Sequence, residues 1–463
     1  MLGMGRLAVM AIFAGLVSAH GVWAEPLEIP DRPPPLTFEE HVDYVGWYNE
    51  FVRRGRDEGD NAYPLYLKLC PDKDGLCGFP EPRGEADKQF DAATDWVWTK
   101  EEFPELAAYL EECEPYFAIF EDALEKPGCW IPADPKSKRI GDIHIPVEYH
   151  CKRLIAAMTR RVWMDTPQRG DELIGLWRRM LRHAQHLDDT SMSVKSRART
   201  YQREICEQVL AALESGVLAG KELEVYGLLS SPDTFSEVLR RSMMIDWAYR
   251  LEFVQHCVER GGPDPSKWVF NRQLIEELGY HYTEEIEQIG FTFNIERAME
   301  WIEVSNSTAI EYVQSGRLNE LHDRIVKLQK DQWKDISTAE IFSYGFTIGT
   351  PGLYEYEPFV RARANRRGTL LMLAVHAFEH KNGKWTDSLD ALDAAMKLKG
   401  FGEAMIDPYS DKPFVYKLKD GKPVLYSVGV NGVDDGGVRR NELGGRFGDV
   451  DLVFWPYERP EPR

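Results

Sequence analysis

The strongest constraint on the fold is a long run of apolar residues spaced three and four apart, between residues 147 and 330. Such spacing gathers apolar side chains on one face of a helix and predicts amphipathic helices packed against one another. The three clearest stripes are Val147, Cys151, Leu154, Ile155, Met158 and Val162; Leu173, Leu176, Trp177, Met180, Leu181, Ala184 and Leu187; and Tyr201, Ile205, Val209 and Ala212. The sequence therefore predicts a multi-helix array.

The ends of one further helix are marked by turn residues. Ser231-Pro232 is an N-cap followed by proline at the first helical position, and Gly261-Gly262-Pro263 closes the same helix. The stripes do not recur at a fixed length, so a regular solenoid of helix pairs remains one alternative rather than a requirement. Four tryptophans fall on the apolar stripes, which favours core packing over a carbohydrate platform: Trp163, Trp177, Trp247 and Trp301.

Helical spacing also occurs before the array. Residues 37–56 and 101–125 each carry an apolar stripe, and the turn-rich string CPDKDGLCGFPEPRG lies between them. Residues 126–146 contain proline and glycine and are expected to form a link. We therefore expect a helical and loop-rich region ahead of the main array.

The pattern changes to β-structure after Asp407. Phe414, Tyr416 and Leu418 alternate with polar residues, and a second alternating run follows Asp420-Gly421. Asp-Gly between two alternating runs predicts a hairpin, because both central residues of a type I′ turn need positive φ. With expected helices at 359–380 and 385–396 and a last strand at 449–455, the C-terminus should be a small α+β unit with an antiparallel sheet.

The N-terminus has the features of a secretory signal peptide. Arg6 precedes the apolar stretch from Leu7 to Ala19, and Val22 and Ala24 form a small-x-Ala cleavage site. An uncleaved anchor is the alternative, but the stretch is short for about 30 Å of hydrocarbon. We expect export to the periplasm or the extracellular space after cleavage near Ala24.

These patterns divide the chain into five parts. They are a signal peptide, an N-terminal helical and loop-rich region, a helical array, a linker and a C-terminal α+β domain, at residues 1–24, 25–146, 147–336, 337–358 and 359–463.

Charge and composition exclude several classes of partner. Lys and Arg number 56 against 76 Asp and Glu, which gives a net charge of −20. Nucleic-acid binding needs a basic face that displaces counterions, so no nucleic-acid partner is expected. After the N-terminal stretch no segment approaches the ~20 apolar residues of a membrane span, so none is expected in the mature chain. The expected partner is an unknown protein of the cell envelope.

Seven cysteines follow the cleavage site: Cys70, Cys77, Cys113, Cys129, Cys151, Cys206 and Cys257. Export exposes them to an oxidising compartment, where disulfides persist. Cys70–Cys77 and Cys113–Cys129 are the shortest closures, although spacing alone does not fix the connectivity. An odd count leaves at least one thiol free or intermolecular.

The C-terminal fifth of the chain resembles a known family. Residues 359–455 are similar to the soluble part of the major, G-type pseudopilin of type II secretion. The matching strings, in order, are EHKNGKW at 379–385, SLDAL at 388–392, DPYS at 407–410, PFVY at 413–416, LYSVG at 425–429, NG at 431–432, DDGG at 434–437 and DVDL at 449–452. The whole chain also resembles exported bacterial proteins of no known activity that carry a helical array ahead of this module.

The pseudopilin resemblance implies a helix packed on a small antiparallel sheet, and calcium bound in the loop that matches residues 427–451. Calcium takes six to eight oxygen ligands. In that loop Asn431, Asp434, Asp435, Asp449 and Asp451 could supply the oxygens, although Asn431 replaces an acid of the family pattern. The alternative is a solvated acidic turn that holds no ion. A pilus role is not implied, because the matching helix carries four arginines, which a bilayer or dry pilus core would not accept: Arg361, Arg363, Arg366 and Arg367.

Three other motifs are candidate sites. His376-Ala377-Phe378-Glu379-His380 fits H-x-x-E-H, in which two histidines hold zinc and the glutamate acts as base. Residues 70–81 partly match an EF-hand loop, but Cys70 occupies the first ligand position, which favours a disulfide-closed turn. His183 and His186 are interpreted as surface or half-buried residues rather than ligands.

The sequence thus predicts a non-catalytic exported scaffold or binding protein of the cell envelope, with calcium as its possible ion. A metal-dependent hydrolase that uses the HAFEH segment is the alternative. A purely structural envelope component is a third reading.

Overall fold

The structure is a computed structural model of the 463-residue chain. It describes residues 32–37, 40–69, 79–93, 98–133, 140, 146–164, 170–188, 192–230, 235–261, 295–314, 320, 324–325, 327–328, 331, 353–437 and 451–456. The signal peptide and its cleavage site lie outside these residues, as do Cys70, Cys77 and most of the EF-hand-like segment.

The N-terminal region contains the two predicted helices, with shorter bounds than expected for the first. That helix begins at Tyr44, because the Asp43 side chain accepts a hydrogen bond from the Gly46 amide at 2.8 Å and caps it. Among the described residues, short α- and 3₁₀-helices lie between it and the second predicted helix. The elements are α2 (Tyr44–Arg53), η1 (Glu58–Asp60), α3 (Tyr63–Tyr66), η2 (Leu67–Leu69), α4 (Glu85–Ala92) and α5 (Pro104–Leu124).

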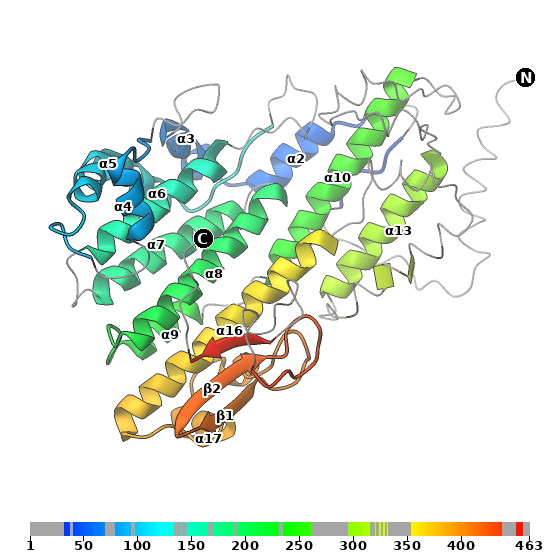
Figure 1. The fold of residues 1–463 in the computed structure, drawn as a ribbon. Helices are drawn as coiled ribbons and strands as arrows, with labels where there is room; N and C mark the ends of the chain where they lie inside the picture. Colours follow the sequence, from blue (N-terminus) through cyan, green and yellow to red (C-terminus); the bar gives the residue numbers. More distant parts are fainter. Residues whose placement is uncertain are drawn as a thin grey trace, which may run out of the picture.

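The helical array is confirmed where the structure describes it (Figure 1). All four tryptophans of the apolar stripes are fully buried, so core packing was the right interpretation of them. One short helix, α9, was not separately predicted. The elements are α6 (Pro146–Trp163), α7 (Gly170–Asp188), α8 (Met192–Glu214), α9 (Glu222–Leu229), α10 (Phe235–Gly261) and α13 (Ile295–Gln314).

The C-terminal unit combines helices with the predicted antiparallel sheet. The described strands form a three-stranded sheet in the order β1-β2-β3, with both pairs antiparallel. Asp420 and Gly421 have φ values of 53° and 76°, as the predicted hairpin turn requires. The elements are α16 (Leu353–Asn382), α17 (Leu389–Met396), α18 (Phe401–Ala404), β1 (Val415–Lys419), β2 (Lys422–Ser427) and β3 (Leu452–Trp455).

The long helix α16 is the central element of the fold. It begins at Leu353, inside the stretch expected to be a linker, and packs on α8 and α9 on one side and on β2 and β3 on another (Figure 1). The consecutive residues Leu371 to Val375 all have 0% exposure. A helix buried on consecutive residues is covered all round rather than along one stripe.

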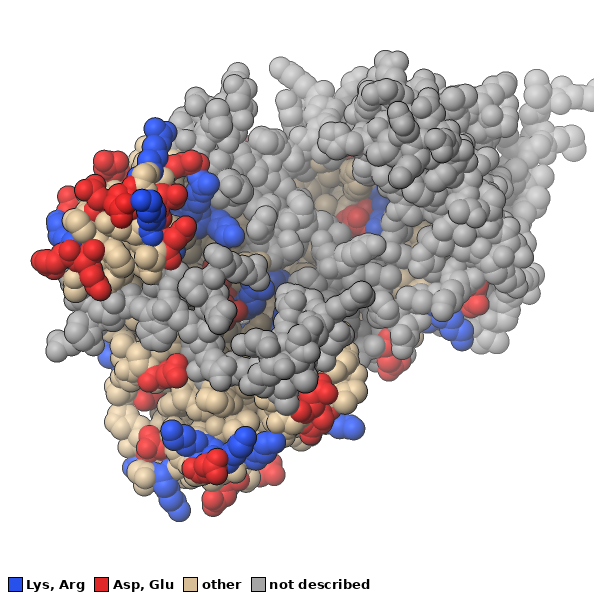
Figure 2. Space-filling view, viewed as in Figure 1, with Lys and Arg blue, Asp and Glu red and all other residues tan. Residues whose placement is uncertain are grey.

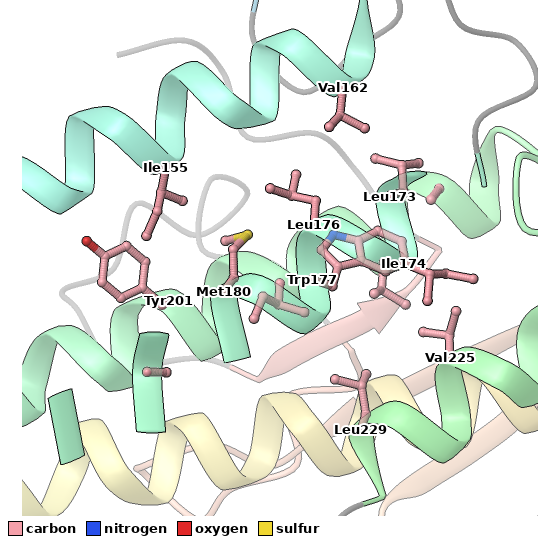
Figure 3. Close-up of a cluster of buried hydrophobic side chains, with 14 of the residues drawn as sticks. Ile155, Val162, Leu173, Ile174, Leu176, Trp177, Met180, Tyr201, Val225 and Leu229 are labelled. Atoms are coloured by element: carbon pink, nitrogen blue, oxygen red, sulfur yellow. The ribbon is translucent and has the colours of Figure 1, made fainter. Parts of the chain in front are cut away.

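Two clusters of buried side chains make up the described core. The larger one joins α5 to α9, the middle of α16 and the sheet. Figure 3 shows part of it, where α7 presents Leu173, Trp177 and Met180 between α6, α8 and α9. The smaller cluster joins α2, α10 and α13 and includes Phe359 of α16. Helix α16 therefore contributes to both clusters, and the division into domains at 337–358 stays a prediction.

The arginines of α16 bind ends of neighbouring helices. Arg366 Nε donates to the Leu229 carbonyl at 2.6 Å, at the end of α9. Arg367 donates to the Ile406 carbonyl at 2.8 Å and to Glu403 Oε1 at 2.6 Å, just after and within α18. These contacts satisfy carbonyls that helix ends leave open.

Within the described part of the chain, none of the helices has the length and apolarity that crossing a bilayer requires.

The Cys113–Cys129 closure that the spacing favours is not formed in this structure. Both side chains are buried in the core and form no disulfide, as is also the case for Cys151 and Cys206. Cys113 lies on the buried stripe of α5, so it packs as a small apolar side chain. Burial raises the pKa of the Cys113 thiol to about 12, which keeps it protonated and poorly reactive.

The close approach of β3 to α16 gives a testable prediction. A Cβ at Gly368 would lie 2.6 Å from the Phe454 ring, and ring and helix are both buried. We expect Gly368→Ala to lower the free energy of unfolding by about 2 kcal/mol, because overpacking outweighs the gain in helix propensity. Urea denaturation measures the change.

A matched control is Gly227→Ala in α9, where an added Cβ meets nothing within 4 Å. This substitution should be neutral or stabilise by up to about 1 kcal/mol. Equal effects at the two glycines would contradict the packing of β3 on α16.

Candidate functional site

The sequence-predicted ligands come together in one turn after β2. We call residues 428–437 together with Asp451 the acidic turn. It contains four of the five predicted ligands: Asn431, Asp434, Asp435 and Asp451. The fifth, Asp449, lies outside the described residues. Gly429, Gly432, Gly436 and Gly437 all have positive φ, which lets the chain fold back on itself.

The carboxylates of the acidic turn hold its backbone. Asp434 Oδ1 accepts from the Gly436 amide and from the Tyr426 hydroxyl, both at 2.9 Å. Asp451 Oδ2 accepts from the Gly437 amide at 2.7 Å, and its Oδ1 faces the Asp435 amide at 3.4 Å. Asp451, directly before β3, thereby fixes the far end of the turn.

Electrostatics differ among these carboxyl groups. Hydrogen bonds from Gly436 and Tyr426 hold the pKa of Asp434 below its usual value. Burial raises the pKa of Asp451, and repulsion from Asp435 and Asp434 adds to this. A cation would relieve that repulsion.

The fit to calcium is partial. An ionised carboxylate has about four acceptor positions. The carboxylates of the acidic turn therefore keep lone pairs that are not occupied by the backbone amides they already bind. In the described part of the chain, however, no group of three His, Cys, Asp or Glu side chains is arranged to hold a metal ion. A complete ligand set would need carbonyl oxygens of the turn or residues of the 438–450 stretch, including Asp449.

Asp407 is a site residue that the sequence analysis did not single out. It is 1% exposed, and its carboxylate accepts from the Ser427 hydroxyl at 2.9 Å, the Tyr409 amide at 3.0 Å and the Val428 amide at 3.2 Å. Burial raises the pKa of Asp407 although these donors oppose the shift. Asp407 thus fixes the start of the acidic turn. Asp before Pro-Tyr-Ser is a local turn signal, but the sequence does not show that the Val428 amide would donate to this carboxylate.

The HAFEH segment lies at the end of α16, and its histidines have different surroundings. The His376 ring packs between Trp385 and Trp455, with ring centroids 5.1 and 4.6 Å away. Burial lowers the pKa of His376 to about 4. His380 is half exposed, with Nδ1 3.5 Å from Glu222 Oε1 of α9. No third ligand joins them among the residues described, so no observation favours a zinc site here.

The interpretation of His183 and His186 as surface or half-buried residues is wrong. They are 0% and 1% exposed, and both face the Tyr66 hydroxyl, which lies 3.1 Å from His183 Nδ1 and 2.8 Å from His186 Nδ1. The rings stack edge-on around Tyr66, Phe120 and Tyr201. The physical reason is that α3 covers this face of α7 with a polar group of its own.

A shallow cleft lies between α5, α6 and α7. Its floor is apolar, with Phe117, Met158 and Val162, and its rim is charged. Arg161 Nε bonds Glu114 at 2.8 Å on the rim. Figure 2 shows basic and acidic side chains interspersed on the described surface in that view.

Comparison with protein families, with curated proteins and with solved structures finds no match to this chain.

The role of Asp407 can be tested by Asp407→Asn. Both carboxylate oxygens accept hydrogen bonds, so an amide NH₂ in either orientation faces a donor. We expect a loss of about 2–3 kcal/mol in the free energy of unfolding, in the range for hydrogen bonds to charged groups. The matched control is Asp390→Asn on the exposed face of α17, expected to cost less than about 1 kcal/mol. A neutral Asp407→Asn in urea denaturation would contradict this role.

Proposed function

We propose that the protein is a non-catalytic, exported scaffold or binding protein of the cell envelope. Its helical array presents a C-terminal α+β unit that resembles the G-type pseudopilin of type II secretion. The supporting observation is that α16 packs at once on α8 and α9 of the array and on β2 and β3 of the sheet. The two parts share a helix, so the unit is presented in a fixed orientation.

The arginines of α16 support a scaffold rather than a pilus subunit. In a pseudopilin-like unit the long helix continues into an apolar anchor, whereas here the arginine-bearing half of α16 binds other helices of the same molecule. Arg366 and Arg367 bind the ends of α9 and α18. Guanidinium groups engaged in this way dock the helix on its own chain.

The cleft between α5, α6 and α7 is the surface we assign to partner binding. It has an apolar floor inside a rim of paired charges, the arrangement typical of interface cores and their polar rims. A concave face on a helical array suits an extended binding surface.

Calcium binding by the acidic turn is part of the proposal. Asp434, Asp435 and Asp451, with Asn431 and Asp449, would supply the oxygens, and the ion would neutralise the repulsion among them. The chain's own groups pre-form the turn, since Asp407 holds its start and Asp451 holds its end. Calcium would therefore bind a turn whose two ends are already fixed.

The calcium proposal predicts a shift in thermal unfolding of residues 25–463. Sites of the extracellular type have dissociation constants of roughly 10⁻⁴–10⁻³ M. Calcium at 100 times that constant should stabilise the fold by about 2.7 kcal/mol relative to EDTA. Asp451→Asn and Asp434→Asn should each abolish this shift.

The matched control is Asp420→Asn, which removes a carboxylate from the hairpin turn at the opposite end of β2 and keeps a residue that accepts positive φ. It should respond to calcium like the wild type.

A stabilisation by micromolar zinc that is lost in His376→Ala, with no calcium response, would favour the hydrolase.

Export is tested by expressing the full chain and sequencing the N-terminus of the protein recovered outside the cytoplasm. The expected N-terminus is Glu25, from cleavage after Ala24. Full-length protein retained in the cytoplasm would overturn the envelope location, and an Ala24→Trp variant, expected to block cleavage, provides the comparison.

A further inference from the structure

The geometry around Tyr66 fixes where each proton lies. His186 Nε2 is 2.9 Å from the Lys126 carbonyl oxygen, which can only accept, so Nε2 carries a proton. In the neutral ring, Nδ1 is then an acceptor, and the Tyr66 hydroxyl donates to it. The Tyr66 oxygen in turn accepts from His183 Nδ1. Donation runs in one direction, from His183 through Tyr66 and His186 to the Lys126 carbonyl.

This series of hydrogen bonds among the described residues offers no acceptor for an additional proton. His183 Nε2 is the remaining acceptor nitrogen, and it is buried with no hydrogen-bond partner among the described residues. His186 Nδ1 is already filled by the proton of Tyr66. Protonating either ring therefore leaves a buried N–H or O–H without an acceptor, which costs about 1–3 kcal/mol, more for a charged group.

The surrounding groups do not stabilise an imidazolium. Those that act on Tyr66 are Cys129 after α5, Cys151 of α6, Arg182 of α7 and Tyr201 of α8, which are neutral or cationic at pH 7. Asp188 near the end of α7 pairs with Arg199 of α8. In agreement, burial first and His186 second lower the pKa of His183 to about 3.

Tyr66 belongs to a short segment with little other burial. We call residues 63–69, which form α3 and η2, the strap. It packs on α5 and α6, and Tyr66 and Leu69 are its two fully buried residues. Ahead of it, Asn61 is anchored by two hydrogen bonds to the Trp130 backbone, which involve no titratable group. The strap can open about Asn61 while that anchor persists.

We propose that His183, Tyr66 and His186 form an acid-sensitive latch, which holds the strap on helices α5 to α7 at neutral pH and releases it as the pH falls. Opening exposes the imidazoles to water, where they take up protons below about pH 6.5. The open form binds more protons than the closed form, so acid favours opening. This inference does not rest on the proposed function.

Amide hydrogen exchange of the strap, corrected for intrinsic rates, tests the latch between pH 6 and pH 4. For each imidazole protonated on opening, the corrected exchange rate should rise about tenfold per pH unit. Residues 370–375 of α16 should keep their protection over the same range, because the opening is local. Strap exchange that does not depend on pH, or α16 exchange with the same pH slope, would overturn the proposal.

Two variants sharpen the test. His183→Phe keeps the hydrogen bonds from Tyr66 through His186 to the Lys126 carbonyl. The change in the corrected strap exchange rate per pH unit should therefore be about tenfold smaller than in the wild type. Tyr66→Phe should already raise strap exchange at pH 7.5, which remains measurable if His183→Phe folds poorly. The matched control is His376→Phe, which removes a buried histidine between Trp385 and Trp455 and should leave the strap slope unchanged. A slope unaltered by His183→Phe contradicts the latch.

Discussion

The fold depends on burying α16 from every side. Residues Leu371 to Val375 are consecutive and fully covered, so a single neighbouring helix could not satisfy them. Helices α8 and α9 cover part of the surface and the sheet covers another part. Gly368 lets Phe454 come close enough to complete the cover. The remaining helices are then arranged around those that touch α16.

Polar groups on α16 are accommodated by the same neighbours. A helix with this many charges can be central only if the charges reach solvent or a partner, since a buried unpaired charge is costly. Arg366 and Arg367 find carbonyls at the ends of α9 and after α18. The charged and apolar parts of the helix therefore both favour the same docked position.

Local patterns were sufficient to predict the longer helices and the hairpin, but not the short helices α3, α4, α9 and α18. Three-and-four spacing located the helices, and Asp420-Gly421 located the hairpin, because both signals arise within a few residues. The all-round burial of α16 was not visible, since its stripe is interrupted by arginines whose partners lie far away in sequence. Tyr66 reaches His183 across 117 residues, so no local pattern could show that these histidines are buried. The Cys113–Cys129 pairing failed for the same reason, as core packing and not chain proximity decides where Cys113 points.

The position of α16 after most of the helices that it packs on has a consequence for biosynthesis. Synthesis reaches residues 353–456 only after the helices from α2 to α13, yet side chains from Ala62 onward share their core with Leu371, Phe414 and Phe454. Contacts of such sequence separation cannot form until the final quarter of the chain has emerged. The nascent N-terminal helices are thus left without their main apolar partner until α16 has been synthesised.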